Sequence, residues 1–314
     1  MISSTLRFLL FAVCYFGFFI LLGLADKAID MLARQFPLTS PAKNMQAPFR
    51  YLGSKHRLVP WLMDHFPPHS TYVEPFGGSG AVLLNKAPAP VEVFNDLNGD
   101  VVNLYALLRR PRLAERLARL LHLTPYAEAE HATARDRHRC TPLERARRFL
   151  LLSHANHSTA HNATAFRLTT EPEHNYAQEW AALPARLAPV AERLQGVTIT
   201  MRDFSELIPR YDQPGVFLYC DPPYTPGERS KGNAYKHELT AERHRELCGL
   251  LNHCKHALWA LSGYANDIYE RHLKYSAKYT TTNATAYHKR TVETLWTNYT
   301  VRSLFTQPCQ TTDN

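Results

Sequence analysis

The sequence has few cysteines, six in 314 residues. No pair of them has the spacing of metal ligands, and they are too sparse to hold a small protein together by disulfides. Their scarcity excludes a disulfide scaffold and fits a reducing compartment, so we predict a cytoplasmic protein. The six are Cys14, Cys140, Cys220, Cys248, Cys254 and Cys309.

Internal repeats and long low-complexity tracts are also absent, but the N-terminus carries one long hydrophobic run. Residues Leu6–Ala25 contain a single charged residue, Arg7, and are long enough to cross a membrane as a helix. The run predicts an inner-membrane anchor, a signal peptide, or an extension outside the working protein if translation starts at Met45. We favour the start at Met45, and we expect membrane contact through residues 6–25 only if residues 1–44 are expressed.

From residue 45 onward, short apolar runs alternate with helical patterns, as in a parallel sheet with helices between its strands. We therefore predict an α/β fold with a Rossmann-like sheet. Several predicted strands end in Asp, Gly or Pro, at the edge where open α/β sheets bind their ligands. The predicted strands are Thr71–Glu74, Val91–Asn95, Val197–Met201, Val216–Cys220, Ala257–Ser262 and Val292–Asn298.

The strand pattern disappears between Tyr105 and Gln195. This stretch predicts helices, such as Leu113–Leu123 and Leu143–Ser153, and it has fourteen arginines and no lysine against nine acidic residues. We predict a mostly helical insert at residues 105–195, inside a catalytic domain made of residues 45–104 and 196–314. The net charge of +8 and the pI of about 9.2 agree with an anionic partner.

The strongest chemical signal is an apolar strand that ends in Asp221-Pro222-Pro223-Tyr224. The Asp221 carboxylate and the Pro222 carbonyl are two acceptors that can hold both hydrogens of an amino group and aim its lone pair at a methyl donor. The prolines Pro222 and Pro223 stiffen the turn, and the Tyr224 ring offers a face on which an extruded base can stack. The segment predicts a methyltransferase that acts on the amino group of adenine.

Three further segments predict a nucleoside-binding pocket. Glu74–Gly80 is a glycine-rich turn before a predicted helix at Ala81–Asn85, so the backbone can approach a ligand closely. Asp96 lies about 20 residues downstream, where an acid can bind ribose hydroxyls. Asp203 and Phe204 follow another strand, and an acid and a ring suit the edge and face of an adenine. The turn lacks the six-residue dinucleotide pattern, which favours a nucleoside.

Together with Tyr51–Lys55, these segments resemble the Dam-like family of DNA adenine-N6 methyltransferases, in the same order along the chain. The likeness runs from about Pro48 to Tyr299 and includes Leu261–Tyr264 and Glu293–Tyr299. It implies a Rossmann-like methyltransferase sheet that binds S-adenosylmethionine, and an inserted target-recognition domain whose arginines contact double-stranded DNA. Such site-specific enzymes occur in restriction-modification, and we expect this one to act as a monomer.

The resemblance also implies roles for single residues. Tyr51, Lys55, Asp96 and Asp221 are then cofactor contacts, with Phe76 and Gly78 at its methionine end and Asp203 and Phe204 at its adenine. Asp221, Pro222 and Tyr224 hold the target base, with Pro223 completing the motif. The resemblance does not imply a target sequence, because the family's aromatic-Asn-Gly stretch has no counterpart in Phe149–Arg167.

Two weaker signals are interpreted as structural. His154, His157 and His161 lack an obvious cysteine or acid to complete a zinc site, so we expect no metal. Cys220 adjoins Asp221, but direct displacement at a sulfonium methyl group needs no protein nucleophile. We interpret Cys220 as a strand residue.

Two other functions remain open at this stage. One is the same methyl transfer with RNA as the substrate. The large basic insert favours duplex DNA instead. The other is a non-catalytic, membrane-anchored DNA-binding protein that retains the methyltransferase fold. The run Leu6–Ala25 supports it, whereas the intact motifs favour an enzyme.

Overall fold

The computed structural model describes residues 44–51, 53–136, 140–156, 165–170, 173–223, 239–284 and 290–301. Residues Lys43–Asn314 form one unit and residues Met1–Ala42 another. The hydrophobic run Leu6–Ala25 lies outside the described residues, so the predictions made for it stay predictions. No helix among the described residues combines the length and the apolar character that a membrane span requires.

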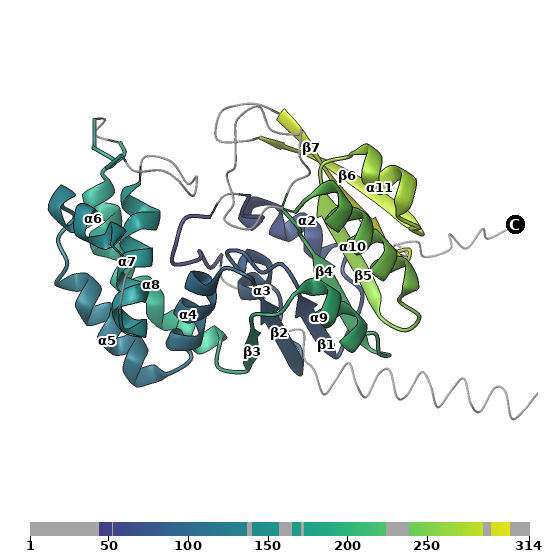
Figure 1. The fold of residues 1–314 in the computed structure, drawn as a ribbon, viewed down its shortest axis with the longest axis horizontal. Helices are drawn as coiled ribbons and strands as arrows, with labels where there is room; N and C mark the ends of the chain where they lie inside the picture. Colours follow the sequence, from purple (N-terminus) through teal and green to yellow (C-terminus); the bar gives the residue numbers. More distant parts are fainter. Residues whose placement is uncertain are drawn as a thin grey trace, which may run out of the picture. The chain divides into compact units, whose positions relative to one another are not determined.

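Seven described strands form one sheet in the order β3-β2-β1-β4-β5-β7-β6 (Figure 1). The first five strands of this order are parallel, and β7 is antiparallel to both of its neighbours. This arrangement confirms the predicted Rossmann-like α/β sheet. The strands are β1 (Thr71–Glu74), β2 (Val91–Asn95), β3 (Val197–Thr200), β4 (Val216–Cys220), β5 (Leu258–Gly263), β6 (Ala277–Ala284) and β7 (Arg290–Thr297).

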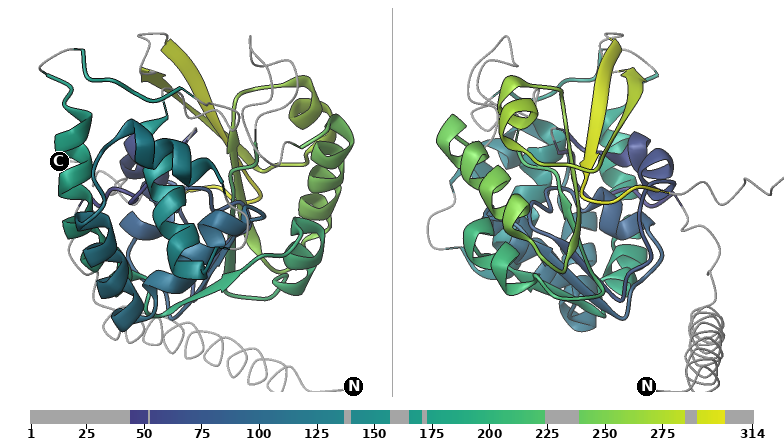
Figure 2. Two further views of the ribbon diagram at one scale, coloured as in Figure 1. Left: turned by 60° about the vertical axis from the view of Figure 1, so that its left-hand side comes forward. Right: turned by 90° about the vertical axis from the view of Figure 1, so that its right-hand side faces the viewer.

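Helices cover both faces of the sheet, so its central strands are apolar on both sides. In β4 every residue is buried, and alternate side chains enter two separate hydrophobic cores. Phe217 and Tyr219 point to one core, and Leu218 and Cys220 point to the other. The second core is covered by α9 (Phe204–Arg210), α10 (Ala241–His253) and α11 (Asp267–His272), which lie on the side opposite the insert (Figure 2).

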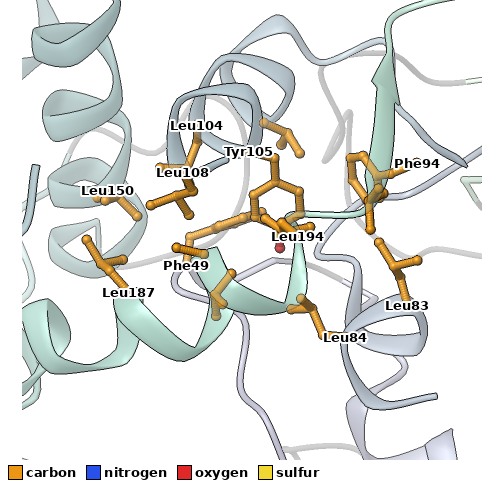
Figure 3. Close-up of a cluster of buried hydrophobic side chains, with 14 of the residues drawn as sticks. Phe49, Leu83, Leu84, Phe94, Leu104, Tyr105, Leu108, Leu150, Leu187 and Leu194 are labelled. Atoms are coloured by element: carbon orange, nitrogen blue, oxygen red, sulfur yellow. The ribbon is translucent and has the colours of Figure 1, made fainter. Parts of the chain in front are cut away.

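The first core extends from the sheet into the insert. It is covered by η1 (His56–Leu58), α2 (Val59–Met63) and α3 (Ala81–Asn85), and beyond them by the helices between β2 and β3. Figure 3 shows Leu83 and Phe94 of the sheet side in one cluster with Leu104, Leu150 and Leu187 of the insert side. The insert helices are α4 (Gly99–Leu108), α5 (Pro111–His122), α6 (Glu128–Arg135), α7 (Pro142–Ala155) and α8 (Tyr176–Arg193).

The amphipathic pattern of α5 explains how an Arg-rich segment packs into this core. Its buried residues are Ala114, Leu117 and Leu121, whereas Arg112 and Arg116 are exposed. The helix therefore uses one face for packing and presents cations on the other. The helical prediction for this region is confirmed, and α4 crosses residue 105, the predicted first residue of the insert.

The sequence prediction missed β6. Its residues, Ala277–Ala284, are mostly polar and Thr-rich, and the strand lies at the edge of the sheet with β7 as its single described neighbour. An edge strand does not need the apolar side chains of a strand buried in the middle of a sheet. The hydrophobic pattern that identifies buried strands is therefore absent from this segment.

Candidate active site

The predicted site residues gather at the carboxyl edge of the parallel strands. Glu74 ends β1, Asn95 ends β2 and Cys220 ends β4, and these three strands are neighbours in the sheet. Since parallel neighbours end at the same edge, the side chains that follow them meet there.

Asp221 is held from two directions. The Lys55 Nζ lies 2.9 Å from Asp221 Oδ1, and the Ser262 hydroxyl donates to the same oxygen at 3.1 Å. The Ser262 hydroxyl also meets the Tyr219 hydroxyl at 2.9 Å. The two contacts on Oδ1 come from two distant segments, the loop before His56 and the strand β5, so the carboxylate has a defined orientation at the strand end.

Lys55 links Asp221, whose side chain is 20% exposed, to the buried carboxylate of Glu293. Its Nζ lies 3.0 Å from Glu293 Oε1, and the side chains of Lys55 and Glu293 are 5% and 3% exposed. Burial raises the pKa of Asp221, while the Lys55 ammonium and the Ser262 hydroxyl act in the opposite direction. Lys55 therefore keeps Asp221 closer to its ionised form.

Glu74 adds a third carboxyl group to this edge. It is buried, and both its burial and the nearby Asp221 carboxylate raise its pKa well above the ordinary value. Burial and the neighbouring carboxylate thus both favour the protonated form of Glu74 over the charged form.

The glycine turn is shaped by close contacts rather than by composition alone. A Cβ on Gly77 would lie 2.1 Å from the Phe94 ring, and a Cβ on Gly78 would lie 2.8 Å from the Tyr51 ring. Gly78 also has a φ of 51°, a left-handed conformation that favours glycine. The Gly78 amide donates to Asp96 Oδ2 at 2.7 Å, so the turn and the acid form one cradle.

Asn95 ties this cradle to the end of β3. Its amide nitrogen donates to the carbonyls of Pro75 and Arg202, both at 2.9 Å, and its oxygen accepts from the Arg202 amide at 2.8 Å. Asp203 and Phe204, which follow Arg202, are thereby fixed beside the glycine turn. The rings of Phe76 and Phe204 lie 5.4 Å apart.

The structure thus brings together every predicted site residue that it describes. Tyr51, Phe76, Gly78, Asp96, Asp203 and Phe204 form one group at the ends of β1, β2 and β3, and Lys55 and Asp221 form the adjoining group with Pro222 and Pro223. Tyr224 lies outside the described residues, so its predicted role remains a prediction.

Sequence reasoning missed three contributors to the site. Ser262 and Glu293 lie in segments that carried the family resemblance, but no pattern indicated their contacts with Asp221 and Lys55. Arg243 is one of two arginines on α10 and no sequence pattern singled it out, yet it contacts both Asp203 and Phe204.

The histidine and cysteine interpretations have different outcomes. Of the three histidines considered as zinc ligands, His157 and His161 lie outside the described residues, and no group of metal ligands occurs among the residues that are described. Cys220 is fully buried, and burial raises the pKa of its thiol well above the ordinary value. A protonated, enclosed thiol fits a strand residue rather than a nucleophile.

Comparison with known proteins gives one family over most of the chain. The family described as D12 class N6 adenine-specific DNA methyltransferase matches residues 51–297. The DNA adenine methylase of Serratia marcescens is 27% identical over 188 residues, which cover 59% of this chain and 68% of that protein. The DNA adenine methylase of Escherichia coli K12 is 28% identical over 191 residues, covering 59% and 66%.

Two more distant likenesses follow. A DNA N-6-adenine-methyltransferase of Escherichia phage P1 is 27% identical over 213 residues, which cover 65% of this chain and 27% of that protein. A solved structure of a putative methyltransferase complexed with S-adenosylhomocysteine has a TM-score of 0.35 and 14% identity, covering 82% of this chain and 55% of that one.

Proposed function

Because this chain belongs to the D12 class of N6 adenine-specific DNA methyltransferases, we propose that it transfers a methyl group from S-adenosylmethionine to adenine in DNA with Asp221 as its central catalytic residue. The observation that carries the proposal is the anchoring of Asp221. Both described contacts of its carboxylate, from Lys55 and Ser262, use Oδ1. Within the described part of the chain, Oδ2 is left to accept a hydrogen bond from a substrate.

The proposed chemistry follows from that free acceptor. The lone pair of an adenine amino group is delocalised into the ring, which makes the nitrogen a poor nucleophile. Asp221 Oδ2 and the Pro222 carbonyl would accept the two amino hydrogens and concentrate the lone pair on the nitrogen. The nitrogen would then bond to the methyl carbon as the bond from that carbon to the sulfonium sulfur breaks and leaves a neutral thioether, and one amino proton would pass to water. Tyr224 would stack on the extruded base, as the sequence predicts.

S-adenosylmethionine, when bound, supplies the electrophilic methyl group, and the cradle at the strand ends fits a nucleoside of this kind. The space above Gly78 would be reduced by any side chain, because a Cβ there already meets Tyr51. Asp96 accepts the Gly78 and Asn98 amides, one on each oxygen, which orients its carboxylate at the glycine turn, and we assign it to the ribose hydroxyls. We assign Phe76 to the methionine end and Asp203 with Phe204 to the adenine.

We assign target recognition to the insert, residues 105–195, and catalysis to residues 45–104 and 196–314. The exposed arginines of α5, such as Arg112 and Arg116, make no ion pair with another described residue. Cations presented in this way suit DNA phosphates, which position a duplex without reading its sequence. The charge of the insert therefore supports duplex DNA as the substrate.

The decisive experiment measures transfer of labelled methyl groups from S-adenosylmethionine to unmethylated plasmid DNA. We expect label to appear as N6-methyladenine with the native chain. Asp221→Ala should lower the rate by more than about a thousandfold, because a preorganised acceptor at the reacting atom is lost. Its thermal unfolding should stay cooperative.

Asp267→Ala is the matched control, since Asp267 is 86% exposed on α11 and pairs only with exposed Arg271 among its described ion-pair partners. It should transfer at the native rate. Native-like transfer by Asp221→Ala would contradict the assignment of Asp221, and label on RNA alone would contradict the substrate.

A further inference from the structure

The helix α10 brings an arginine to the corner that we assign to the adenine of the cofactor. Arg243 lies in the first turn of α10, which packs against α9 (Figure 1). Its Nη2 lies 2.5 Å from Asp203 Oδ1 and 2.6 Å from Asp203 Oδ2. Its guanidinium carbon lies 4.3 Å from the centre of the Phe204 ring. One side chain therefore contacts both residues assigned to the adenine.

The two carboxylate oxygens of Asp203 differ in the number of hydrogen bonds that they accept. Oδ1 accepts from the Ser205 amide at 2.9 Å, from the Ser205 hydroxyl at 2.6 Å and from Arg243. Oδ2 accepts from Arg243 alone among the described residues. A carboxylate oxygen has two main acceptor directions, so Oδ1 is saturated and Oδ2 retains one.

Phe204 is fixed by the same arginine. The ring is buried, with Phe76 on one side at 5.4 Å and the Arg243 guanidinium on another. Stacking of a guanidinium on an aromatic face is a favourable contact that also restricts the ring. Arg243 thus locks the carboxylate and the ring in one arrangement.

We propose that Arg243 is a positioning residue of the adenine subsite, which orients Asp203 so that the remaining acceptor direction of Oδ2 receives the 6-amino group of the cofactor. The inference rests on the proposed function, because it assigns this corner to adenine. It makes Arg243 a determinant of specificity for the base of the cofactor, although Arg243 need not touch the cofactor itself.

A purely structural role would have a different consequence. The side chains of Arg243 and Asp203 are both 33% exposed, and half-exposed ion pairs contribute little to the stability of a fold. Loss of Arg243 should therefore leave the protein folded and Asp203 Oδ1 held by Ser205, while Asp203 Oδ2 loses the contact that fixes its direction. The loss of affinity should depend on the 6-amino group of the ligand, whereas a general loosening of the site would weaken binding with or without that group.

The test measures binding of two ligands to the full chain by calorimetry. One is S-adenosylhomocysteine, and the other is its analogue in which hydrogen replaces the 6-amino group. We expect the native chain to prefer S-adenosylhomocysteine by about tenfold or more, as for a hydrogen bond to a charged group. Arg243→Ala should lose most of this preference, with a nearly unchanged Kd for the analogue.

Two companion variants sharpen the result. Arg245→Ala is the matched control on the same helix, because Arg245 is 48% exposed and pairs with exposed Glu242; it should keep the native preference. Arg243→Lys keeps the positive charge and should retain part of the preference, and it replaces the alanine variant if that one fails to fold. In turnover assays, Arg243→Ala should raise KM for S-adenosylmethionine and change kcat by less than about twofold.

Equal weakening of both ligands, or an unchanged preference in Arg243→Ala, would overturn the role of Arg243 while leaving the methyltransferase activity in place. Failure of the native chain to bind S-adenosylhomocysteine, or to methylate DNA, would instead remove the proposed function on which the inference rests.

Discussion

At the scale of single residues, Lys55 is the strongest influence that holds Asp221, the proposed catalytic residue, toward its ionised form. The sequence suggests a cofactor contact at Tyr51–Lys55, but the ammonium lies between Asp221 and Glu293, at 2.9 and 3.0 Å. Asp221 and Glu293 share this cation, so its removal takes an ion-pair contact from both carboxylates. The residue therefore has a positioning and electrostatic role at Asp221, beside any contact with the cofactor.

Replacing this cation should shift the pH dependence of methyl transfer. Burial already raises the pKa of Asp221, and Lys55 is the largest influence acting to lower it. In Lys55→Met that influence is lost, so the pKa of Asp221 rises further. Transfer requires the ionised carboxylate, and the acidic limb of the single-turnover rate should therefore move to higher pH. Stability should fall by about 3–5 kcal/mol, as for a broken buried ion pair.

Lys86→Met provides the matched control. Lys86 is equally buried and pairs with Glu92 at 2.8 Å, on a part of the sheet away from Asp221. It should lose stability in urea unfolding without moving the pH profile. An unmoved profile in Lys55→Met would show that another group keeps Asp221 ionised.

At the scale of secondary-structure elements, a charge network fastens the last insert helix to the sheet. Arg193, at the end of α8, contacts Glu92 of β2 at 2.5 and 2.9 Å and donates to the Leu83 carbonyl of α3 at 2.7 Å. Lys86 completes the network on the same carboxylate. The insert is thus tied to the catalytic sheet by directional contacts as well as by the shared hydrophobic core.

Arg193→Met should destabilise the protein by about 1.5–3 kcal/mol at pH 7, because hydrogen bonds to a charged group are lost. Although burial raises the pKa of Glu92, its bonds to Arg193 and Lys86 prevail and lower it. A carboxyl group with a lowered pKa contributes its full stability above its ordinary value of 4.5, and this contribution is lost as the pH falls through the lowered pKa. Urea unfolding should therefore separate native and variant chains more at pH 7 than at an acid pH below that lowered pKa.

The control for the contact between Arg193 and Glu92 is Arg271→Met on α11. Arg271 and its partner Asp267 are 73% and 86% exposed, so the variant should change stability by less than about 1 kcal/mol at either pH. A similarly small effect of Arg193→Met would mean that the hydrophobic core alone fastens the insert.

At the scale of the whole molecule, charge is unevenly distributed. The net charge is +8, and the insert contributes fourteen arginines against nine acidic residues. Neutralisation of phosphates by such cations releases counterions, so binding depends on salt. If about four phosphates are neutralised, affinity for duplex DNA should fall by about two orders of magnitude between about 50 and 200 mM salt.

Fluorescence anisotropy with a labelled duplex measures this dependence. Arg112→Gln with Arg116→Gln, on the exposed face of α5, should reduce the salt slope while leaving the Kd for S-adenosylhomocysteine unchanged. A salt slope identical to that of the native chain would place the DNA on another face of the insert.

The sequence by itself determined the family and the residues that stand at the ends of the parallel strands. Each of these signals is local: an apolar run sets a strand, and the residues directly after it, such as Asp96 and Asp221, must lie at the sheet edge. The glycine turn and the helix Ala81–Asn85 are local in the same sense. The family match over residues 51–297 confirms the reaction class predicted from these motifs.

The tertiary structure alone decided which distant side chains complete the site. Arg243 reaches Asp203 from forty residues away, and Ser262 of β5 and Glu293 of β7 reach Asp221 and Lys55 from strands that follow later in the chain. No local pattern marks such partners, because an arginine on an amphipathic helix looks the same whether it faces water or a carboxylate. Only the packing of α10, β5 and β7 against the rest of the fold fixes their partners, and with them the orientation of Asp221.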